Sequence, residues 1–366
     1  MDGIPLIDGA ALRPLAHPAR ADAADDEAFV AYARVRNAVR FETTGRVDEH
    51  VEPHALIALV RSDDDMHRRQ WSVIDRQGET IGLAALDVIA DDGGRTAYLT
   101  VDLLRRTWGR GVGSAALRVL EDLARREGVE RLLVWAEHSG DEPRLASPTG
   151  FGSVPRDHSA RFLARHGFTL EQVERVSSLR LDGHGLLPRL SRLHEEATRL
   201  AHAYRVVSWT LPTPAEHVEG YAWMKSRMST DAPDAELGMP EETWDAERVA
   251  RHDGRYLDLG NTVLVTAAQH RESGELCAFN ELSVGPEHGR TTHQEDTLVL
   301  GAHRGHRLGM LVKTAGLLAW RTLRPDSPEV ITYNAEENRP MLSINEEIGF
   351  APIAYEGAWK KDLSLS

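Results

Sequence analysis

The chain has 366 residues, which is more than one ordinary domain holds and suits two. Its formal net charge of −14 argues against binding to a nucleic-acid backbone, because such binding needs a basic surface. The single cysteine, Cys277, excludes an internal disulfide and a cysteine-based metal cluster.

The beginning of the chain indicates its compartment. Residues 1–26 are acidic and rich in Pro and Ala, and they lack the basic start and the apolar run of a signal peptide. The sequence contains no stretch of about 18 apolar residues, so we expect no membrane-spanning segment. We therefore predict a cytoplasmic protein with no membrane or nucleic-acid partner. Its oligomeric state is left open.

The most informative feature is an internal repeat. Residues 98–128 contain an extended run, the turn WGRGVG at 108–113 and a helix, and residues 296–323 repeat this order with the turn RGHRLG at 304–309. In both copies a short strand, a Gly-Phe step and a last strand follow, and the last strand ends thirteen positions after the Phe (168 to 181 and 350 to 363). The repeat predicts two related domains, 1–183 and 184–366, with a linker helix at 184–203.

A strand, a glycine-containing turn and a helix together form an anion site. The first N–H groups of the helix have no intrahelical acceptor, and the helix dipole adds positive potential there. Glycine lets the turn close tightly, so that a phosphate reaches the main chain. The turns lack the features of a Walker loop or a dinucleotide-binding turn. One such turn also fits a plain strand-to-helix connection, but its recurrence in the same context favours phosphate binding.

On these residues the chain resembles a tandem protein of the GNAT superfamily of N-acetyltransferases. The resemblance rests on residues 108–114 with Gly167-Phe168, and on residues 304–309 with 338–350 (NRPMLSINEEIGF). It implies an α+β fold of two domains, each a mixed, mostly antiparallel sheet flanked by helices, and acetyl-CoA or a related acyl-CoA as cofactor. The family pattern at the turn is Arg/Gln-x-x-Gly-x-Gly/Ala. Trp108 replaces its first residue in one copy, and Arg307 replaces its middle glycine in the other.

The resemblance also implies which residues contact the cofactor. They lie in the two turns, in the strands before them and at one asparagine: Leu103, Arg110, Gly111, Val112, Gly113, Ser114, Val299, Arg304, Gly305, His306, Arg307, Leu308, Gly309 and Asn338. Main-chain N–H groups hold the pyrophosphate, so neither departure from the pattern abolishes binding. Arg307 is able to add a charge-assisted contact to phosphate.

The strand before each turn suggests which copy is catalytic, because in the family it lies beside the acyl group and its alternate residues face the substrate. In the second copy that face carries Val299, Thr297, Glu295 and His293. In the first copy it carries Leu103, Val101, Leu99 and Ala97. An ammonium acceptor has to lose a proton before it attacks. We therefore predict chemistry in the second copy, with Glu295 as general base and His293 as its alternative or partner. Solvated edge-strand residues remain the other interpretation, and a one-residue slip would exchange Glu295 with Asp296.

The general acid and the acceptor pocket are less clearly marked. Many family members use a tyrosine seven residues after an asparagine as the general acid. Asn338 matches the asparagine, but the tyrosine position is Asn345, so Tyr333 or a water is the suggested substitute. The residues predicted to line the acceptor pocket are Asn280, Glu281 and Asn334. Their alternative role is that of surface polar groups.

Two further types of site are disfavoured. His303 and His306 have ligand-like spacing but lie within the second turn, so we expect no metal. Ser114 and Thr314 have no evident base partner, which disfavours a nucleophilic mechanism.

The sequence thus predicts an acyl-CoA-dependent N-acetyltransferase that acts on a small amine. A non-catalytic acyl-CoA-binding or regulatory protein is an alternative that the missing tyrosines favour. Transfer from another donor, such as a charged tRNA, is a second alternative, which the acidic charge disfavours. The identity of the acceptor is left open.

Overall fold

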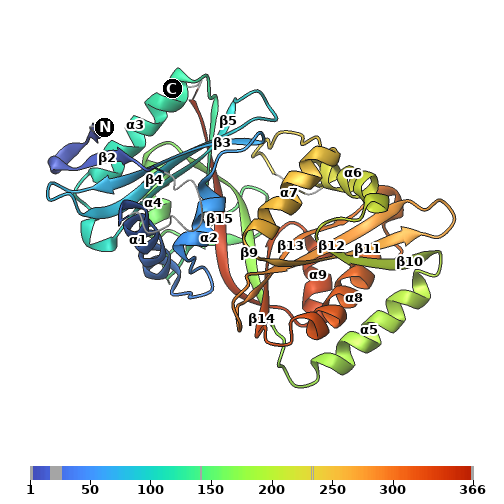
Figure 1. The fold of residues 1–366 in the computed structure, drawn as a ribbon. Coiled ribbons are helices and arrows are strands. Elements are labelled where there is room, and N and C mark those ends of the chain that lie inside the picture. The colour runs from blue at the N-terminus through green and yellow to red at the C-terminus, as the bar shows by residue number, and fades with distance from the viewer. Residues whose placement is uncertain (1–2, 17–26, 141, 232, 234, 364–366) are drawn as a thin grey trace.

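The computed structural model describes residues 3–16, 27–140, 142–231, 233 and 235–363. Within this part of the chain, thirteen strands form one continuous sheet through both halves of the molecule (Figure 1). Its strand order is β1-β2-β3-β4-β5-β6-β15-β9-β14-β13-β12-β11-β10. The strands are β1 (Ile4–Pro5), β2 (Ala11–Pro14), β3 (Met66–Ile74), β4 (Thr80–Ile89), β5 (Thr96–Leu103), β6 (Arg131–His138), β9 (Thr169–Arg180), β10 (Tyr204–Thr210), β11 (Thr262–His270), β12 (Leu276–Val284), β13 (Thr292–Val299), β14 (Glu329–Ala335) and β15 (Ala351–Asp362).

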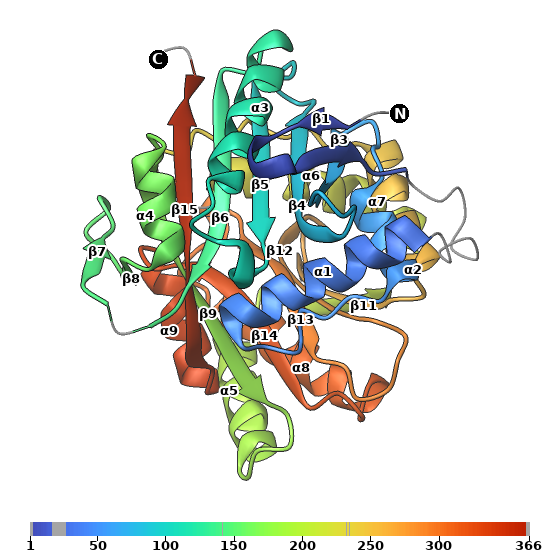
Figure 2. The ribbon, with the colours of Figure 1, turned by 90° about the vertical axis from the view of Figure 1, so that its left-hand side faces the viewer.

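Helices cover both faces of this sheet (Figures 1 and 2). They are α1 (Glu27–Thr44), α2 (Pro53–Val60), α3 (Val112–Arg126), α4 (His158–Arg165), α5 (Leu186–Leu200), α6 (Ala215–Asp231), α7 (Ala246–Asp258), α8 (Leu308–Leu323) and α9 (Arg339–Ile348). The small hairpin of β7 (Arg144–Ala146) and β8 (Ser153–Pro155) lies apart from the main sheet. The predicted α+β class, a mixed and mostly antiparallel sheet flanked by helices, is confirmed.

The helices are held by apolar faces. In α3, Leu117, Leu120 and Ala124 are fully buried, and they are the residues that the helical period places on one face. Helices α1 and α2 pack with Leu83 on the opposite face of the N-terminal strands. In the C-terminal half, α5 and α8 share one apolar cluster, and α6 and α7 share another. The predicted linker helix at 184–203 corresponds to α5.

The last strand of each sequence copy pairs with the other half of the molecule. Strand β9 of the first copy pairs with β14, and β15 of the second copy pairs with β6. The two exchanged strands also pair with each other at the centre of the sheet. The boundary at 183/184 therefore divides the sequence repeat, whereas the hydrogen bonds of β9 and β15 join the two copies into one sheet.

Each half contains one parallel strand pair that opens into a V. Strands β5 and β6 pair only over residues 96–98 and 131–133, and β13 and β14 only over 292–294 and 330–332. Beyond these residues the strands diverge, so main-chain groups face a gap. We call these gaps the N-terminal splay (β5/β6) and the C-terminal splay (β13/β14).

No helix in the described part of the chain is both long and apolar enough to cross a membrane.

Candidate functional site

The N-terminal splay holds a cavity of about 310 Å³. Its walls come from β5, β6, α1, α3 and α4, so it passes from the α3/α4 face of the sheet toward the α1 face. The predicted contact residues Leu103, Gly111, Val112, Gly113 and Ser114 all line it. A volume of this size is in the range of small-molecule sites.

The turn before α3 forms one mouth of this cavity. Gly111 caps the helix with φ +82°, a left-handed conformation that costs glycine little. The first N–H groups of α3 have no intrahelical acceptor. A Cβ added at Gly113 would stand 3.5 Å from Leu103 and Phe162, which is ordinary contact. The side chain of Arg110, another predicted contact, is exposed and pairs with Asp8.

Trp108 and Arg304, the first residues of the two turns, form equivalent hydrogen bonds. Its indole N–H donates to the carbonyl of Leu103 at 2.9 Å, and its ring stacks on His158 at 3.9 Å and 9°. In the second copy, Arg304 Nε donates to the carbonyl of Val299, the equivalent residue, at 3.3 Å. The substitution therefore preserves the bond that closes the turn.

The other end of the cavity is acidic. Glu137, near the end of β6, lines the cavity and is 7% exposed. Burial raises its pKa to about 7, although Arg46 opposes this by donating to Glu137 Oε2 at 2.9 Å. A carboxyl group with this pKa is a suitable general base near neutral pH. The sequence analysis did not select Glu137.

The C-terminal splay is occupied by side chains of the protein itself. Lys313 of α8 is fully buried and donates to Asn345 Oδ1 at 2.8 Å. Asn345 Nδ2 in turn donates to Asn334 Oδ1 at 2.7 Å. Burial lowers the pKa of Lys313 to about 7, because an ammonium group is poorly solvated there. Two predicted site residues, Asn345 and Asn334, thus meet, but their partner is a lysine that the sequence analysis did not select.

The second turn is more tightly packed than the first. A Cβ added at Gly309 would stand 2.9 Å from Ile344. Arg307 caps α8 in a left-handed conformation with φ 60°, and its guanidinium pairs with Glu347 at 3.1 Å instead of lying free for phosphate. Asn338 caps α9 by accepting from the N–H of Met341. The remaining predicted contacts here are Gly305 with φ +88°, the exposed His306 and the buried Leu308.

The predicted shared face of β13 is wrong, because the strand contains a bulge. Thr297 is paired with Asn280 but Gln294 with Leu282, so two residues of β13 oppose one of β12. The extra residue reverses the alternation, and His293 leaves the face of Thr297 and Val299. Ser283 donates to Glu295 at 2.6 Å. The first-copy strand β5 is regular, and the predicted face of Leu99, Val101 and Leu103 is confirmed.

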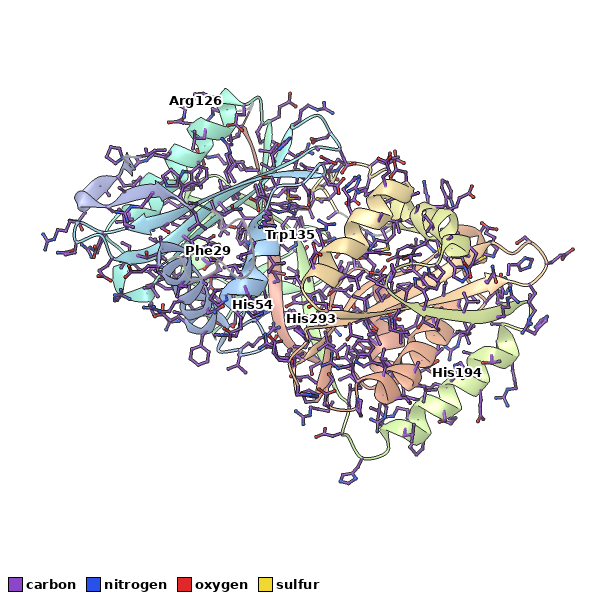
Figure 3. The ribbon with its side chains drawn as sticks, in the orientation of Figure 1. Phe29, His54, Arg126, Trp135, His194 and His293 are labelled. Atoms are coloured by element: carbon purple, nitrogen blue, oxygen red, sulfur yellow. The ribbon has the colours of Figure 1, made fainter. Side chains whose placement is uncertain are left out.

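Glu295 and His293 line a different cavity, of about 650 Å³. Its other walls include Val47, Asp48, His50 and Val51 of the first copy and Tyr256 of α7. Figure 3 shows His293 near the junction of the two halves. The structure therefore brings the two predicted catalytic residues together, but away from the filled C-terminal splay.

The other predicted acceptor and acid residues are separated from one another. Asn280 accepts from Thr297 at 2.9 Å, whereas its neighbour Glu281 lies on the opposite face, where it is bonded to Tyr221 and Lys225. The hydroxyl of Tyr333 accepts from Arg46 at 3.2 Å. These three side chains do not form a single pocket.

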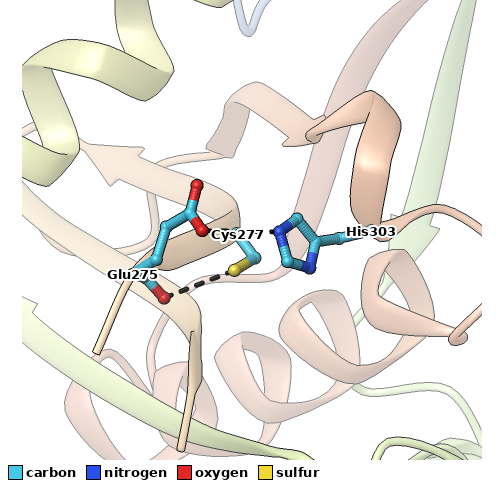
Figure 4. Close-up of side chains that lie close together, drawn as sticks. All are labelled: Glu275, Cys277 and His303. Carbon is cyan, nitrogen blue, oxygen red and sulfur yellow. Dashed lines mark hydrogen bonds and ion pairs between the residues drawn. The ribbon is translucent and has the colours of Figure 1, made fainter. Parts of the chain in front are cut away.

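Two small clusters bear on the excluded chemistries. Ser114 does have a partner, because its hydroxyl lies 2.9 Å from His166 Nε2, a contact that the sequence could not reveal. Cys277, Glu275 and His303 place their potential ligand atoms within 4.8 Å of one another (Figure 4). Burial, and secondarily Glu275, raises the pKa of Cys277 to about 11. A thiol held in the neutral form is a poor nucleophile.

A glycine-containing turn and a helix follow each of the two splayed parallel pairs, so the sheet carries the same α+β unit twice. Residues 23–146 match the model of the Acetyltransferase (GNAT) family, and this segment contains β5, the first turn, α3 and β6. That match covers about a third of the chain, so this segment is similar to the GNAT family, and the likeness of the whole chain to solved structures is one of fold. No match was found among curated proteins.

Solved structures of tandem and related proteins share this fold. A tandem GNAT protein from the clavulanic acid biosynthesis pathway, determined without AcCoA, gives a TM-score of 0.73 at 23% identity over 97% of this chain and 98% of that one. A GCN5-related N-acetyltransferase from Sphaerobacter thermophilus gives 0.62 at 16% identity, with coverage of 98% and 97%. The GCN5-related glucosamine N-acetyltransferase region of a fungal multi-domain β-N-acetylglucosaminidase gives 0.60 at 11% identity, over 98% of this chain and 38% of that one.

Proposed function

We propose that the chain transfers the acetyl group of acetyl-CoA to a small amine, and that the N-terminal splay both binds the cofactor and hosts the reaction. The cavity that joins the first turn to Glu137 carries this proposal. It places an anion-binding helix start at one mouth and a carboxyl group with a raised pKa at the other. The matching segment of the family model, 23–146, lies in the same half.

The proposed binding mode follows from the residues along the cavity. The pyrophosphate rests on the N–H groups at the start of α3, as anions do at helix N-termini. The pantetheine arm passes between β5 and β6, where main-chain groups are free of strand partners. A main-chain N–H of β5 beyond Tyr98 polarises the thioester carbonyl. The acceptor approaches from the α1 face.

Glu137 acts as the general base in this proposal. It removes the proton from the ammonium, the free amine attacks the carbonyl carbon, and the bond from carbon to sulfur breaks. The nitrogen then gives its remaining extra proton to water as the thiolate leaves, and the thiolate takes a proton from water, because the tyrosine position of the first copy is the apolar Leu163. This assignment moves the proposed chemistry from the second copy to the first.

A matched pair of substitutions tests which splay is used. Val101→Trp fills the N-terminal splay, and Thr297→Trp is its counterpart at the same repeat position, 196 residues later. We expect Val101→Trp to abolish acetyl-CoA binding, measured by calorimetry, and thiol release with an amine panel. Thr297→Trp should preserve both.

The reverse result would place the chemistry in the second copy. Binding of acetyl-CoA without thiol release by the unaltered protein would favour the non-catalytic alternative. The milder Val101→Phe guards against misfolding, and melting temperatures check that each variant is folded.

A further inference from the structure

Three carboxylates stand side by side at the centre of the sheet. Glu137 of β6 is in register with Glu356 of β15, and Glu356 is in register with Glu174 of β9. Residues in register on adjacent strands point to the same face, so the three side chains form one row, which we call the carboxylate row. At about 4.8 Å per strand, its ends lie roughly 10 Å apart.

This row depends on the exchange of the last strands. Glu174 and Glu356 occupy the same repeat position, six residues after Phe168 and Phe350. Because β9 and β15 pair with each other, these equivalent residues become direct neighbours. Like charges in register destabilise a sheet, so this arrangement needs a compensating partner.

Among the residues that the structure describes, two of the three carboxylates have no cationic partner. Glu137 is paired with Arg46. In the described part of the chain, the donor to Glu174 is the indole N–H of Trp135 at 3.4 Å, and no side chain forms an ion pair or hydrogen bond with Glu356. Burial and, after it, the charge of Glu337 raise the pKa of Glu174. Burial, followed by the charges of Glu174 and Glu137, raises the pKa of Glu356 to about 8.

A second cavity, of about 250 Å³, begins where the first one ends. Trp135 lines both, and it lies at the junction of the two halves (Figure 3). The walls of the second cavity include the carboxylates of Glu174, Glu242 and Asp296, the rings of Trp135 and Trp244, and the ammonium of Lys225. Lys225 lies 4.8 Å from the Trp244 ring and pairs with Asp296. The side of the cavity left to a further ammonium group is therefore that of Glu174 and Trp135, because carboxylates and aromatic faces both attract cations.

We propose that the acceptor carries two amino groups: one reacts beside Glu137, and the other is held as an ammonium by Glu356, Glu174 and the wall of Trp135. This inference rests on the proposed function for its reacting end. The carboxylate row then selects acceptors by the distance between their two amino groups. The second copy contributes Glu356 to a reaction that takes place in the first copy.

Binding of the second ammonium group should release protons. With a pKa of about 8, Glu356 is mostly protonated at pH 7, and a bound cation favours its ionised form. Affinity should therefore rise from pH 6 to pH 9. Other charged groups near the row are Arg40, Arg46, Asp48, Glu49, Asp102, Tyr333 and Glu337, and Lys225, Glu242 and Asp296 line the second cavity with Glu174. Of these, Arg46 and Arg40 oppose the rise in the pKa values of the glutamates.

Calorimetry without acetyl-CoA tests the row directly. The probes are putrescine and n-butylamine, which differ by one amino group. We expect putrescine to bind about tenfold more tightly or better, and to release protons at pH 7, measured by comparing phosphate and Tris buffers. Glu356→Gln should lower the proton release with putrescine to that seen with n-butylamine, whose single ammonium group binds beside Glu137, and, like Glu174→Gln, should remove most of the preference for the diamine.

The control is Glu272→Gln in the exposed turn after β11, which should change neither result. Equal affinities for the two probes, or a preference that survives both substitutions, would overturn the proposal. Failure of the proposed function looks different: diamines would bind with proton release, yet no thiol would be released from acetyl-CoA. A melting curve from pH 5 to pH 8 shows that Glu356→Gln is folded. Its stability should fall less with rising pH than that of the parent, because above pH 4.5 the parent's Glu356 ionises in the unfolded chain while it stays protonated in the folded one.

Discussion

The two splays have the same strands, turn and helix but different contents. In the N-terminal splay, Leu117 and Leu163 border an open cavity. At the same repeat positions the C-terminal splay has Lys313 and Asn345, four residues after Gly309 and five before Phe350. These two are buried and bonded to each other. The two copies thus differ at two side chains. In the first copy they are apolar and line a cavity, and in the second copy they are polar and form a hydrogen bond with each other.

This difference shows how a repeat diverges without losing its fold. The second copy keeps its turn, its helix start and its place in the sheet, because β9 and β15 tie both halves together. A buried lysine that has one hydrogen-bond partner destabilises the fold, so the second copy carries a polar group that a purely structural core would avoid. We infer that its contribution has moved from the splay to the carboxylate row and to the acceptor side.

The largest effect is expected when the two differing side chains of one splay are replaced by those of the other. Leu117→Lys combined with Leu163→Asn should lower thiol release about 100-fold or more, roughly 2.7 kcal/mol of transition-state binding, because the lysine occupies the pantetheine path. The reciprocal pair, Lys313→Leu with Asn345→Leu, should keep turnover within about twofold. A loss of activity only in the reciprocal variant would contradict the difference described above.

The two acidic strand ends provide the next test. Glu137 and Glu336 each lie six residues after the first paired residue of their strand, but Glu336 is bonded to Arg175 at 2.7 Å. Glu137→Gln should lower kcat/KM about 100-fold, as the loss of a general base does. The parent should gain activity as pH rises through about 7, the pKa of Glu137, and the variant should lose this limb. Glu336→Gln should leave the pH profile unchanged.

Lys313 gives a smaller effect on stability. Its pKa is about 7 in the folded chain and about 10.4 when unfolded, so the unfolded state binds more protons between these values. Stability should therefore rise with pH from 7 to 10. Lys313→Met should flatten this rise and stabilise the protein at pH 7 by about 1–3 kcal/mol, measured by denaturant unfolding. The control is Lys360→Met on β15. A destabilised Lys313→Met would show that the lysine is better accommodated than its burial suggests.

The sequence was sufficient to predict the elements but not their partners. The internal repeat located β9 and β15, and helical periodicity located the buried face of α3. Neither pattern shows which neighbouring strand a strand pairs with, and β6 and β14 offer equivalent edges. The pairing of β9 with β14 and of β15 with β6 therefore could not be predicted from the sequence. The bulge near Glu295 was missed for a similar reason, because one extra residue inverts a period-two pattern without any marker in the sequence.

Some of the site was visible in the sequence but was not recognised. Lys313 interrupts an otherwise apolar helix face, which is a signal for a buried polar group. Glu174 and Glu356 recur at one repeat position, yet only their pairing across the sheet turns this recurrence into a site. Glu137 carried no such signal, because its pKa depends on burial and on Arg46, which is 91 residues away in the chain.

The mildest prediction concerns the first residue of each turn. Trp108→Arg restores the family residue, and the bond to the carbonyl of Leu103 should survive, because Arg304 forms the same bond to Val299. The stack on His158 is lost, and with it one flat wall of the cavity. We expect KM for acetyl-CoA to change by no more than about threefold, roughly 0.6 kcal/mol. The reciprocal Arg304→Trp should leave KM unchanged, since the second turn does not bind the cofactor in this proposal. A large rise in KM for Arg304→Trp alone would mean that the second turn holds the pyrophosphate after all.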